Sequence, residues 1–231
     1  MTKLGFLLIA FASTGCGLID SDVTNYDLTL PDKQFSVDAS GWQVDQQQAD
    51  AFLMQSCSSS PMVCMTAATT ACPMNCSGSC STTTSTCELG LDVGVYKTID
   101  LVTEKPELKE INDRAVIEVE IDSVTYAVTM NTLNVETPEM KVYVAPMSIM
   151  DPNDPMSKHI GTIAPVPANA TVAPREMVFT ATGRADLIAT MSSYKNPFNI
   201  IVGSQIVMGS GDMVPMGRLD AVVQIKAHAG L

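Results

Sequence analysis

The chain has 231 residues and carries 13 Lys and Arg against 25 Asp and Glu, which gives a formal net charge of −12 at pH 7. This charge opposes electrostatic attraction to nucleic acids, and we expect no nucleic-acid partner. With 46% hydrophobic and 16% charged residues, the composition excludes a disordered chain and indicates a globular protein with a core of its own.

The N-terminal segment has the features of an export signal. Lys3 supplies a positive charge, residues 4–12 form an apolar run, and small residues lead to Cys16. The run is less than half of the roughly 20 apolar residues that a membrane-spanning helix needs. A charged start, a short apolar stretch and small residues before the cleavage site are typical of a secretory signal peptide.

The motif STGC at residues 13–16 resembles the lipobox of bacterial lipoproteins, although this family usually has Leu where Ser13 stands. The resemblance implies that residues 1–15 are removed as a signal peptide, that Cys16 is lipidated, and that residues 16–24 form a tether. An ordinary secretory signal that contains a cysteine is the alternative.

Lipidation at Cys16 makes the lipid bilayer the first expected partner. One acyl chain anchors a protein only marginally, whereas a lipoprotein cysteine carries three by this resemblance. In many enteric-type bacteria an Asp after the cysteine retains a lipoprotein in the inner membrane, and this chain has Gly17 there. We therefore expect an outer-membrane lipoprotein of the cell envelope that faces the periplasm or the exterior.

Six further cysteines lie close together in the sequence. They are Cys57, Cys64, Cys72, Cys76, Cys80 and Cys87. An even count in an exported chain predicts a disulfide framework, whose connectivity the sequence does not determine. The surrounding residues are mostly Ser, Thr, Ala and Gly, so this segment needs covalent links to become ordered.

A metal site is the alternative for this cluster, and a redox-active role is a second one. The four-residue spacing of Cys72, Cys76 and Cys80 would align them on a helix, but Pro73 and Gly78 disfavour one. Neither a Cys-x-x-Cys pair nor a histidine occurs in the cluster. We therefore expect three disulfides, no metal and no cofactor.

The sequence of residues 25–56 predicts short strands and a short helix. Two strands are expected in residues 25–38 around a turn at Pro31, and a short helix within residues 44–56. From Leu91 onward strand patterns dominate, and apolar residues alternate with polar ones up to residue 101. Lys97 is the exception, because it falls on the apolar face.

Residues 117–128 alternate in two phases. The two apolar sets are Ile117, Val119 and Ile121, and then Val124, Tyr126 and Val128. Because side chains in a strand alternate with a period of two, the shift predicts a bulge or bend at Asp122 and Ser123. We expect that such a bent strand crosses from one sheet of a sandwich to the other.

The remaining elements are expected in alternating order. Strands are predicted over 140–146, 160–163 and 172–180, a helix over 185–193, and a long β-hairpin formed by residues 198–208 and 218–228. The pattern predicts a mainly β fold, an antiparallel β-sandwich with one or two short helices. We expect one domain over residues 25–231, with a disulfide-rich insertion at residues 56–88.

Two segments of this body carry a family resemblance. Residues 129–135, TMNTLNV, and residues 141–146, KVYVAP, resemble uncharacterised β-rich envelope lipoproteins of the myxobacterial type. The resemblance covers residues 91–231 and includes no catalytic motif. Because that family has no assigned activity, the resemblance implies location and fold alone.

The sequence contains few candidates for catalytic or metal-binding residues. His159 and His228 have no ligand or nucleophile at a recognised spacing, so we expect both to be solvated surface residues. Acidic residues on one face of residues 118–122 are typical of a solvated strand face. The Asp and Asn residues of the loop 151–154 have enough oxygen atoms to bind calcium, but they are ordinary turn formers beside proline.

Aromatic and sulfur-containing residues complete the composition. Trp42 is the single tryptophan, and few aromatic platforms are available for carbohydrate binding. The 15 methionines are scattered along the chain, and we do not find in them the Met-x-x-Met runs of a copper-handling protein. We expect them to fill the core.

These observations predict a non-enzymatic envelope protein with a structural or protein-binding role, whose strand edges and loops contact other envelope proteins. A periplasmic hydrolase with an unrecognised site is one alternative. An accessory subunit of an envelope transport or assembly complex is the other.

Overall fold

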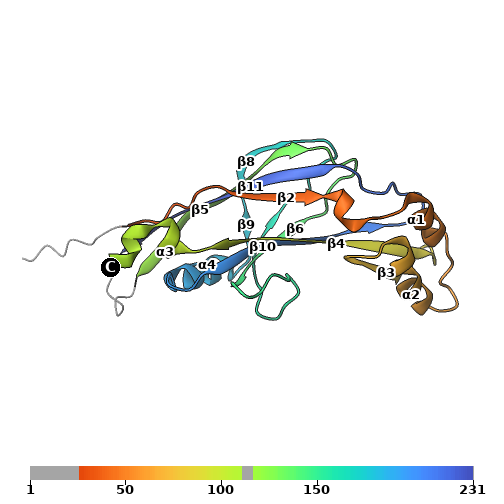
Figure 1. Cartoon of the computed structure of the whole chain (residues 1–231), viewed down its shortest axis with the longest axis horizontal. Helices are drawn as coiled ribbons and strands as arrows, with labels where there is room; N and C mark the ends of the chain where they lie inside the picture. Colours follow the sequence, from red (N-terminus) through yellow and green to blue (C-terminus); the bar gives the residue numbers. More distant parts are fainter. Residues whose placement is uncertain (1–25, 111–116, 231) are drawn as a thin grey trace, which may run out of the picture.

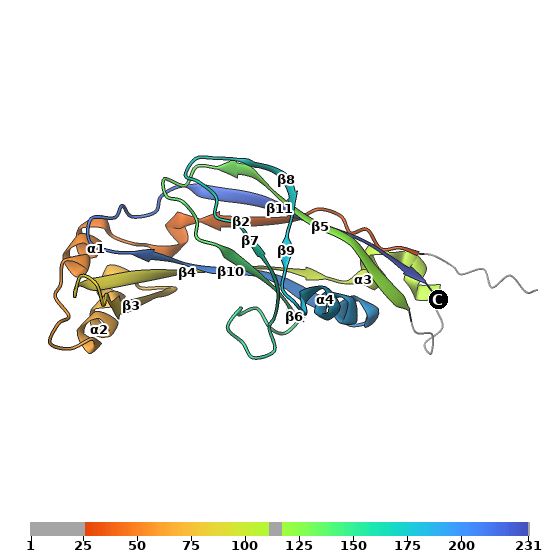
Figure 2. The same cartoon turned by 180° about the vertical axis from the view of Figure 1, so that it is seen from behind.

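A computed structural model of the chain describes residues 26–110 and 117–230. Two antiparallel sheets pack against each other in an elongated body, with helices near both ends (Figures 1 and 2). The predicted class, a mainly β antiparallel sandwich with disulfide-linked cysteines, is confirmed. The predicted signal peptide and Cys16 lie outside the described residues. Within the part that is described, no helix is both long enough and apolar enough to span a membrane.

The first sheet has five strands. They are β1 (Tyr26–Asp27), β2 (Lys33–Asp38), β5 (Glu118–Asn131), β8 (Val172–Glu176) and β11 (Arg218–Gly230). β11 is central, with β5 along one side and β1 and β2 in succession along the other, while β8 borders β5. The two short strands predicted in residues 25–38 are therefore confirmed as β1 and β2.

The second sheet has six strands in the order β3-β4-β10-β6-β7-β9. They are β3 (Cys76–Cys80), β4 (Cys87–Ile99), β6 (Met140–Pro146), β7 (Lys158–Ile163), β9 (Val178–Phe179) and β10 (Phe198–Met208). β4 and β10 pair without interruption from Ile99 opposite Phe198 to Leu89 opposite Met208. This long pair connects β3 on one side of the sheet with β6, β7 and β9 on the other.

The predicted hairpin of residues 198–208 and 218–228 is wrong, although both strands exist. β10 belongs to the six-stranded sheet and β11 to the five-stranded sheet. Gly209 does begin a tight turn, since its N–H donates to Asp212 Oδ2 at 2.8 Å. The chain then continues across to the other sheet, where Met216 N–H donates to Asn134 Oδ1 at 2.6 Å. The turn signal was correct, but alternation alone does not identify the partner of a strand.

The predicted bulge in β5 is confirmed. Ser123 pairs with Lys226 and Ile121 pairs with Ala227, so Asp122 is the extra residue. Because of this extra residue, the apolar side chains before and after the bulge face the same side of the sheet, and both sets are buried. The expectation that this strand crosses between sheets is wrong, because all of β5 pairs within the five-stranded sheet. The chain crosses instead at the buried Met177, which divides the single strand expected over 172–180 into β8 and β9.

The helices are α1 (Gln46–Leu53), α2 (Met62–Ala71), α3 (Leu101–Glu104) and α4 (Gly183–Ser192), with 3-10 turns at Ala39–Trp42 and Pro106–Glu110. α1 and α4 confirm the two predicted helices. α2 was not predicted, because its buried face consists of the small residues Cys64, Ala68 and Ala71. Leu101 begins α3 instead of ending a strand, because the Asp100 side chain accepts the Thr103 N–H and caps a helix there.

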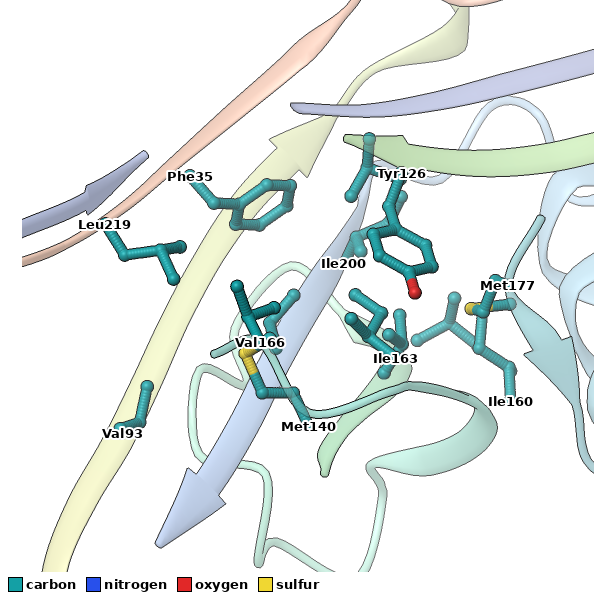
Figure 3. Close-up of a cluster of buried hydrophobic side chains, with 14 of the residues drawn as sticks. Phe35, Val93, Tyr126, Met140, Ile160, Ile163, Val166, Met177, Ile200 and Leu219 are labelled. Atoms are coloured by element: carbon teal, nitrogen blue, oxygen red, sulfur yellow. The ribbon is translucent and has the colours of Figure 1, made fainter. Parts of the chain in front are cut away.

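The core lies between the two sheets (Figure 3). Phe35 and Leu219 come from the five-stranded sheet, Val93 and Ile200 come from the six-stranded sheet, and Tyr126 lies among them. All five are at most 7% exposed. The same buried cluster includes four of the six cysteines of the disulfide-rich segment, and the other two pack against it, so that segment packs against the body.

Candidate binding groove and disulfide cap

Three disulfides link the six predicted cysteines, in the pairs Cys57–Cys80, Cys64–Cys87 and Cys72–Cys76. The first two attach the segment that contains α2 to neighbouring strands, because Cys80 and Cys87 are direct partners in the β3–β4 pair. We call α1, α2, β3 and the loops that join them the disulfide cap. The Sγ atoms of Cys57, Cys64 and Cys87 lie within 4.8 Å of one another. All three belong to disulfides, and a disulfide sulfur has no thiolate with which to bind a metal.

The disulfide cap lies at one end of the body, and the first described strand β1 and the last residues of β11 lie at the opposite end (Figures 1 and 2). At one end Tyr26 pairs with Ala229 and Asp27 with His228, so β1 lies beside the C-terminal residues of β11. At the other end the cap packs beside the start of β4. The chain therefore enters the fold at the end remote from its disulfides.

Two cavities adjoin each other between these ends, where β2 faces β4. Their volumes are about 400 Å³ and about 690 Å³, and both are lined by Ser36, Gly94 and Val95. Trp42 closes the smaller one on the side of the cap, since its Nε1–H donates to the Asp92 carbonyl at 2.9 Å. We call the two cavities together the β2–β4 groove.

The groove is bordered by backbone that no strand covers. On β4, the Asp92 N–H donates to the Asn75 carbonyl at 2.8 Å, on the side away from β10. Every second residue of a strand directs its backbone N–H and C=O groups to the same side. The backbone groups of Gly94, Tyr96 and Thr98 therefore also point away from β10. In the described chain β3 pairs with β4 only as far as Leu91, which leaves this stretch as an open edge.

The opposite wall of the groove is also an edge. The Ala39 N–H donates to the Gly217 carbonyl at 3.0 Å, so every second residue of β2 is bonded toward β11. Gln34, Ser36 and Asp38 therefore direct their backbone groups away from the sheet. Cα atoms of β2 and β4 come within 8 Å of each other. A strand inserted between them and bonded to both would need about twice the usual spacing of about 4.8 Å, so no strand can pair with both edges where they come this close.

Charged side chains distinguish the two halves of the groove. Lys97 lines the larger cavity and makes no ion pair with any described residue. Arg218 lines it too, but its Nε contacts Asp220 Oδ1 at 2.7 Å. The hydrogen bond from Arg218, helped by one from Ser36, lowers the pKa of Asp220. In the smaller cavity the hydroxyl and N–H of Ser40 lower the pKa of Asp38 by hydrogen bonding to its carboxylate.

The structure confirms that Lys97 lies on the apolar face of its strand. It is directly opposite Ile200, whose side chain is in the core, yet Lys97 itself is exposed. An inward-facing lysine at an open edge prevents indiscriminate pairing with other strands. The ammonium group of Lys97 is also available to bind a negatively charged group of a ligand. The break in the alternation was therefore the sequence signal for this groove.

The loop 151–154, considered for calcium, borders the smaller cavity. Its carboxylates cap its own turns, since Asp151 Oδ1 accepts the Asn153 N–H and Asp154 Oδ1 accepts the Met156 N–H, both at 2.8 Å. Pro152 packs over Gly203, where a Cβ atom would approach its ring to 2.6 Å. These acids act as the turn formers that the sequence indicated.

The two histidines lie on different sheets. His159 is in β7 and is half-buried, contrary to the expectation of a solvated surface residue. Its ring Nε2 lies 3.0 Å from the Gly161 carbonyl, and the ring packs beside that of Tyr143. His228 is on the polar face of β11, as predicted. Its Nδ1 is 3.0 Å from Asp122 Oδ1, and its Nε2 is 3.3 Å from Glu120 Oε2.

Neither histidine is placed to activate a nucleophile. In the described residues the ring contacts of His159 and His228 are with a carbonyl, an aromatic ring and two carboxylates. A general base for a serine or cysteine nucleophile needs a ring nitrogen within hydrogen-bond reach of that hydroxyl or thiol. The hydrolase alternative therefore receives no support from this geometry.

The contacts of His228 predict a titration that can be measured. The hydrogen bond to Asp122, reinforced by Glu120, raises the pKa of His228 above 6.5. The folded state thus binds this proton more tightly than the unfolded state. The resulting stabilisation is fully present below about pH 6.5 and is lost as the pH rises through the folded-state pKa. We expect Asp122→Asn to return the pKa toward 6.5 in an NMR titration. The control Glu88→Gln, on the other sheet, should leave it unchanged, and an unchanged pKa in Asp122→Asn would contradict the assignment.

The expectation that the methionines fill the core is wrong for most of them. Met140, Met177, Met191 and Met208 are buried, but ten others are at least 40% exposed. The ten are Met54, Met62, Met65, Met74, Met130, Met147, Met150, Met156, Met213 and Met216. Six of them come in pairs with the spacing Met-x-x-Met, at 62 and 65, 147 and 150, and 213 and 216. This spacing was the signal that we missed in the sequence.

Comparison with protein-family models, with curated proteins and with solved structures finds no match for this chain. The function must therefore be argued from the geometry of the groove, the cap and the termini.

Proposed function

We propose that this chain is a lipid-anchored protein of the cell envelope with a non-enzymatic, protein-binding role. The observation that carries the proposal is the separation of β1 and the end of β11 from the disulfide cap along the body (Figure 1). Only nine residues would separate an acylated Cys16 from Tyr26. The membrane would then hold the end formed by β1 and β11, and the cap and the β2–β4 groove would stand away from the bilayer.

The role of the groove in this proposal is to bind an extended segment of another envelope protein. The segment would pair with the open edge of β4 at Tyr96 and Thr98, because unpaired backbone groups of an edge recruit a further strand. An acidic side chain of that segment would meet Lys97, which makes no ion pair with any carboxylate among the described residues. The predicted partner is therefore an exported protein with an exposed, acidic, extended segment.

Site-specific photo-crosslinking in the intact envelope tests this role. A photoreactive residue at Tyr96, which is 40% exposed beside the open edge, should give a discrete cross-linked product with another envelope protein. The matched control is the same residue at Val178, which is 69% exposed on β9 outside the groove, and it should give none.

The second arm reverses the charge at the groove. Lys97→Glu should lower the yield from Tyr96 by about tenfold, the effect of losing about 1.4 kcal/mol of binding free energy. The exposed side chain can change without altering the core, and circular dichroism should confirm an unchanged fold. Equal yields from the two positions, or a yield from Tyr96 that is insensitive to Lys97→Glu, would contradict the proposed groove.

A further inference from the structure

The outer face of α2 displays two thioethers. Met62 is 61% exposed and Met65 is 58% exposed, while Cys64, Ala68 and Ala71 are buried against the body. Residues three apart lie side by side on a helix, with Cβ atoms about 5–6 Å apart. Two flexible methionine side chains at this spacing can bring both sulfur atoms to one ion.

Two hydroxyl groups of α2 already donate hydrogen bonds within the helix. The Thr66 hydroxyl donates to the Met62 carbonyl at 3.1 Å, and the Thr69 hydroxyl donates to the Thr66 carbonyl at 3.3 Å. The segment 55–87 contains no Asp, Glu, Lys, Arg or His at all. Its six cysteines are paired in disulfides. The thioethers are therefore the only soft ligands that this segment presents.

This donor set discriminates strongly among metal ions. Magnesium, calcium and zinc need carboxylate, imidazole or thiolate ligands, which the face of α2 lacks. Thioethers prefer soft ions, above all Cu(I). Met62 is the first residue of α2, where the partial positive charge of the helix dipole opposes a divalent ion more than a monovalent one. The net charge of −12 attracts cations to the molecule as a whole.

From these observations we infer that Met62 and Met65 form a surface site for a soft monovalent cation, Cu(I), on the outer face of α2. Binding requires no redox step, because both sulfur atoms coordinate the ion as neutral thioethers. The site is independent of the β2–β4 groove, and neither assignment depends on the other.

Silver(I) is a suitable probe, since it has the charge and ligand preference of Cu(I) and does not oxidise in air. The protein is the full chain with Cys16→Ser, so that no free thiol competes, labelled at the methionine methyl groups. We expect Ag(I) to shift the methyl signals of Met62 and Met65 together, and excess Zn(II) to leave these shifts in place. Displacement by Zn(II), or signals at Met62 and Met65 that do not move, would overturn the inference.

Stoichiometry provides the second readout. The double variant Met62→Leu/Met65→Leu should bind one Ag(I) fewer per chain in calorimetric titration. Leucine keeps the size and helix propensity of methionine, so α2 should stay folded. The control Met54→Leu/Met130→Leu removes two exposed methionines without a partner three residues away, and should bind as many ions as the parent. An unchanged stoichiometry in the first variant, or an equal loss in both, would overturn the site.

Discussion

Replacing Cys64 and Cys87 together by alanine is expected to lower the free energy of unfolding by about 3 kcal/mol. The two cysteines are 23 residues apart in the sequence, and their disulfide links α2 directly to β4. Without it the unfolded chain gains the freedom of a long loop, and α2 keeps only small side chains to hold it against the body. Urea denaturation of parent and variant, under non-reducing conditions, gives the difference.

The disulfide Cys72–Cys76 provides the matched control, because its two cysteines are only four positions apart in the sequence. Its removal by the same alanine substitutions should cost about 2 kcal/mol on the same relation between loop length and entropy. Hydrogen exchange should also differ, with faster exchange of the α2 amides in the Cys64/Cys87 variant. If the two variants were equally stable and α2 were equally protected, the structural role assigned to Cys64–Cys87 would be wrong.

Gly183→Ala is the second substitution with a large expected effect, about 3 kcal/mol of lost stability. Gly183 is the first residue of α4, and a Cβ atom there would collide with the backbone of Ile160 on β7. Backbone cannot move aside as a flexible side chain can, so α4 would have to shift away from the six-stranded sheet. Leu187 and Met191, now fully buried, would lose part of their packing.

Thermal and urea unfolding of Gly183→Ala should therefore show a marked destabilisation. Gly41→Ala is the appropriate control, because a Cβ at Gly41 meets no atom within 4 Å. We expect the control to differ from the parent by less than about 1 kcal/mol. A Gly183→Ala variant as stable as Gly41→Ala would show that α4 does not pack on Ile160 as described.

Much of this fold follows from the alternation of apolar and polar residues. The phase shift between Ile121 and Val124 located the bulge in β5, because only an extra residue lets both apolar sets face one core. The same patterns gave the strand bounds of β6, β10 and β11 closely. They did not reveal that β10 and β11 belong to different sheets, because alternation determines which face is buried and not which strand lies beside it.

Three features on which the proposals depend were missed for different physical reasons. The buried face of α2 consists of alanines and a cysteine, which differ little in hydrophobicity from the residues on its exposed face. The sequence therefore shows no helical periodicity there, and disulfides attach the helix to the sheet. The groove depends on two edges that meet only in the folded state, and Lys97 was its one trace in the sequence. The exposed methionines were misassigned, because a hydrophobic residue is expected inside unless its spacing is considered.

The most direct test of the proposed function is the intact mass of the protein extracted from the membrane fraction of its host. We predict a chain that begins at Cys16, with the added mass of acyl groups at that residue and with the other six cysteines in three disulfides. A chain that retains residues 1–15, or one that lacks acyl groups and is recovered from the soluble fraction, would contradict the account.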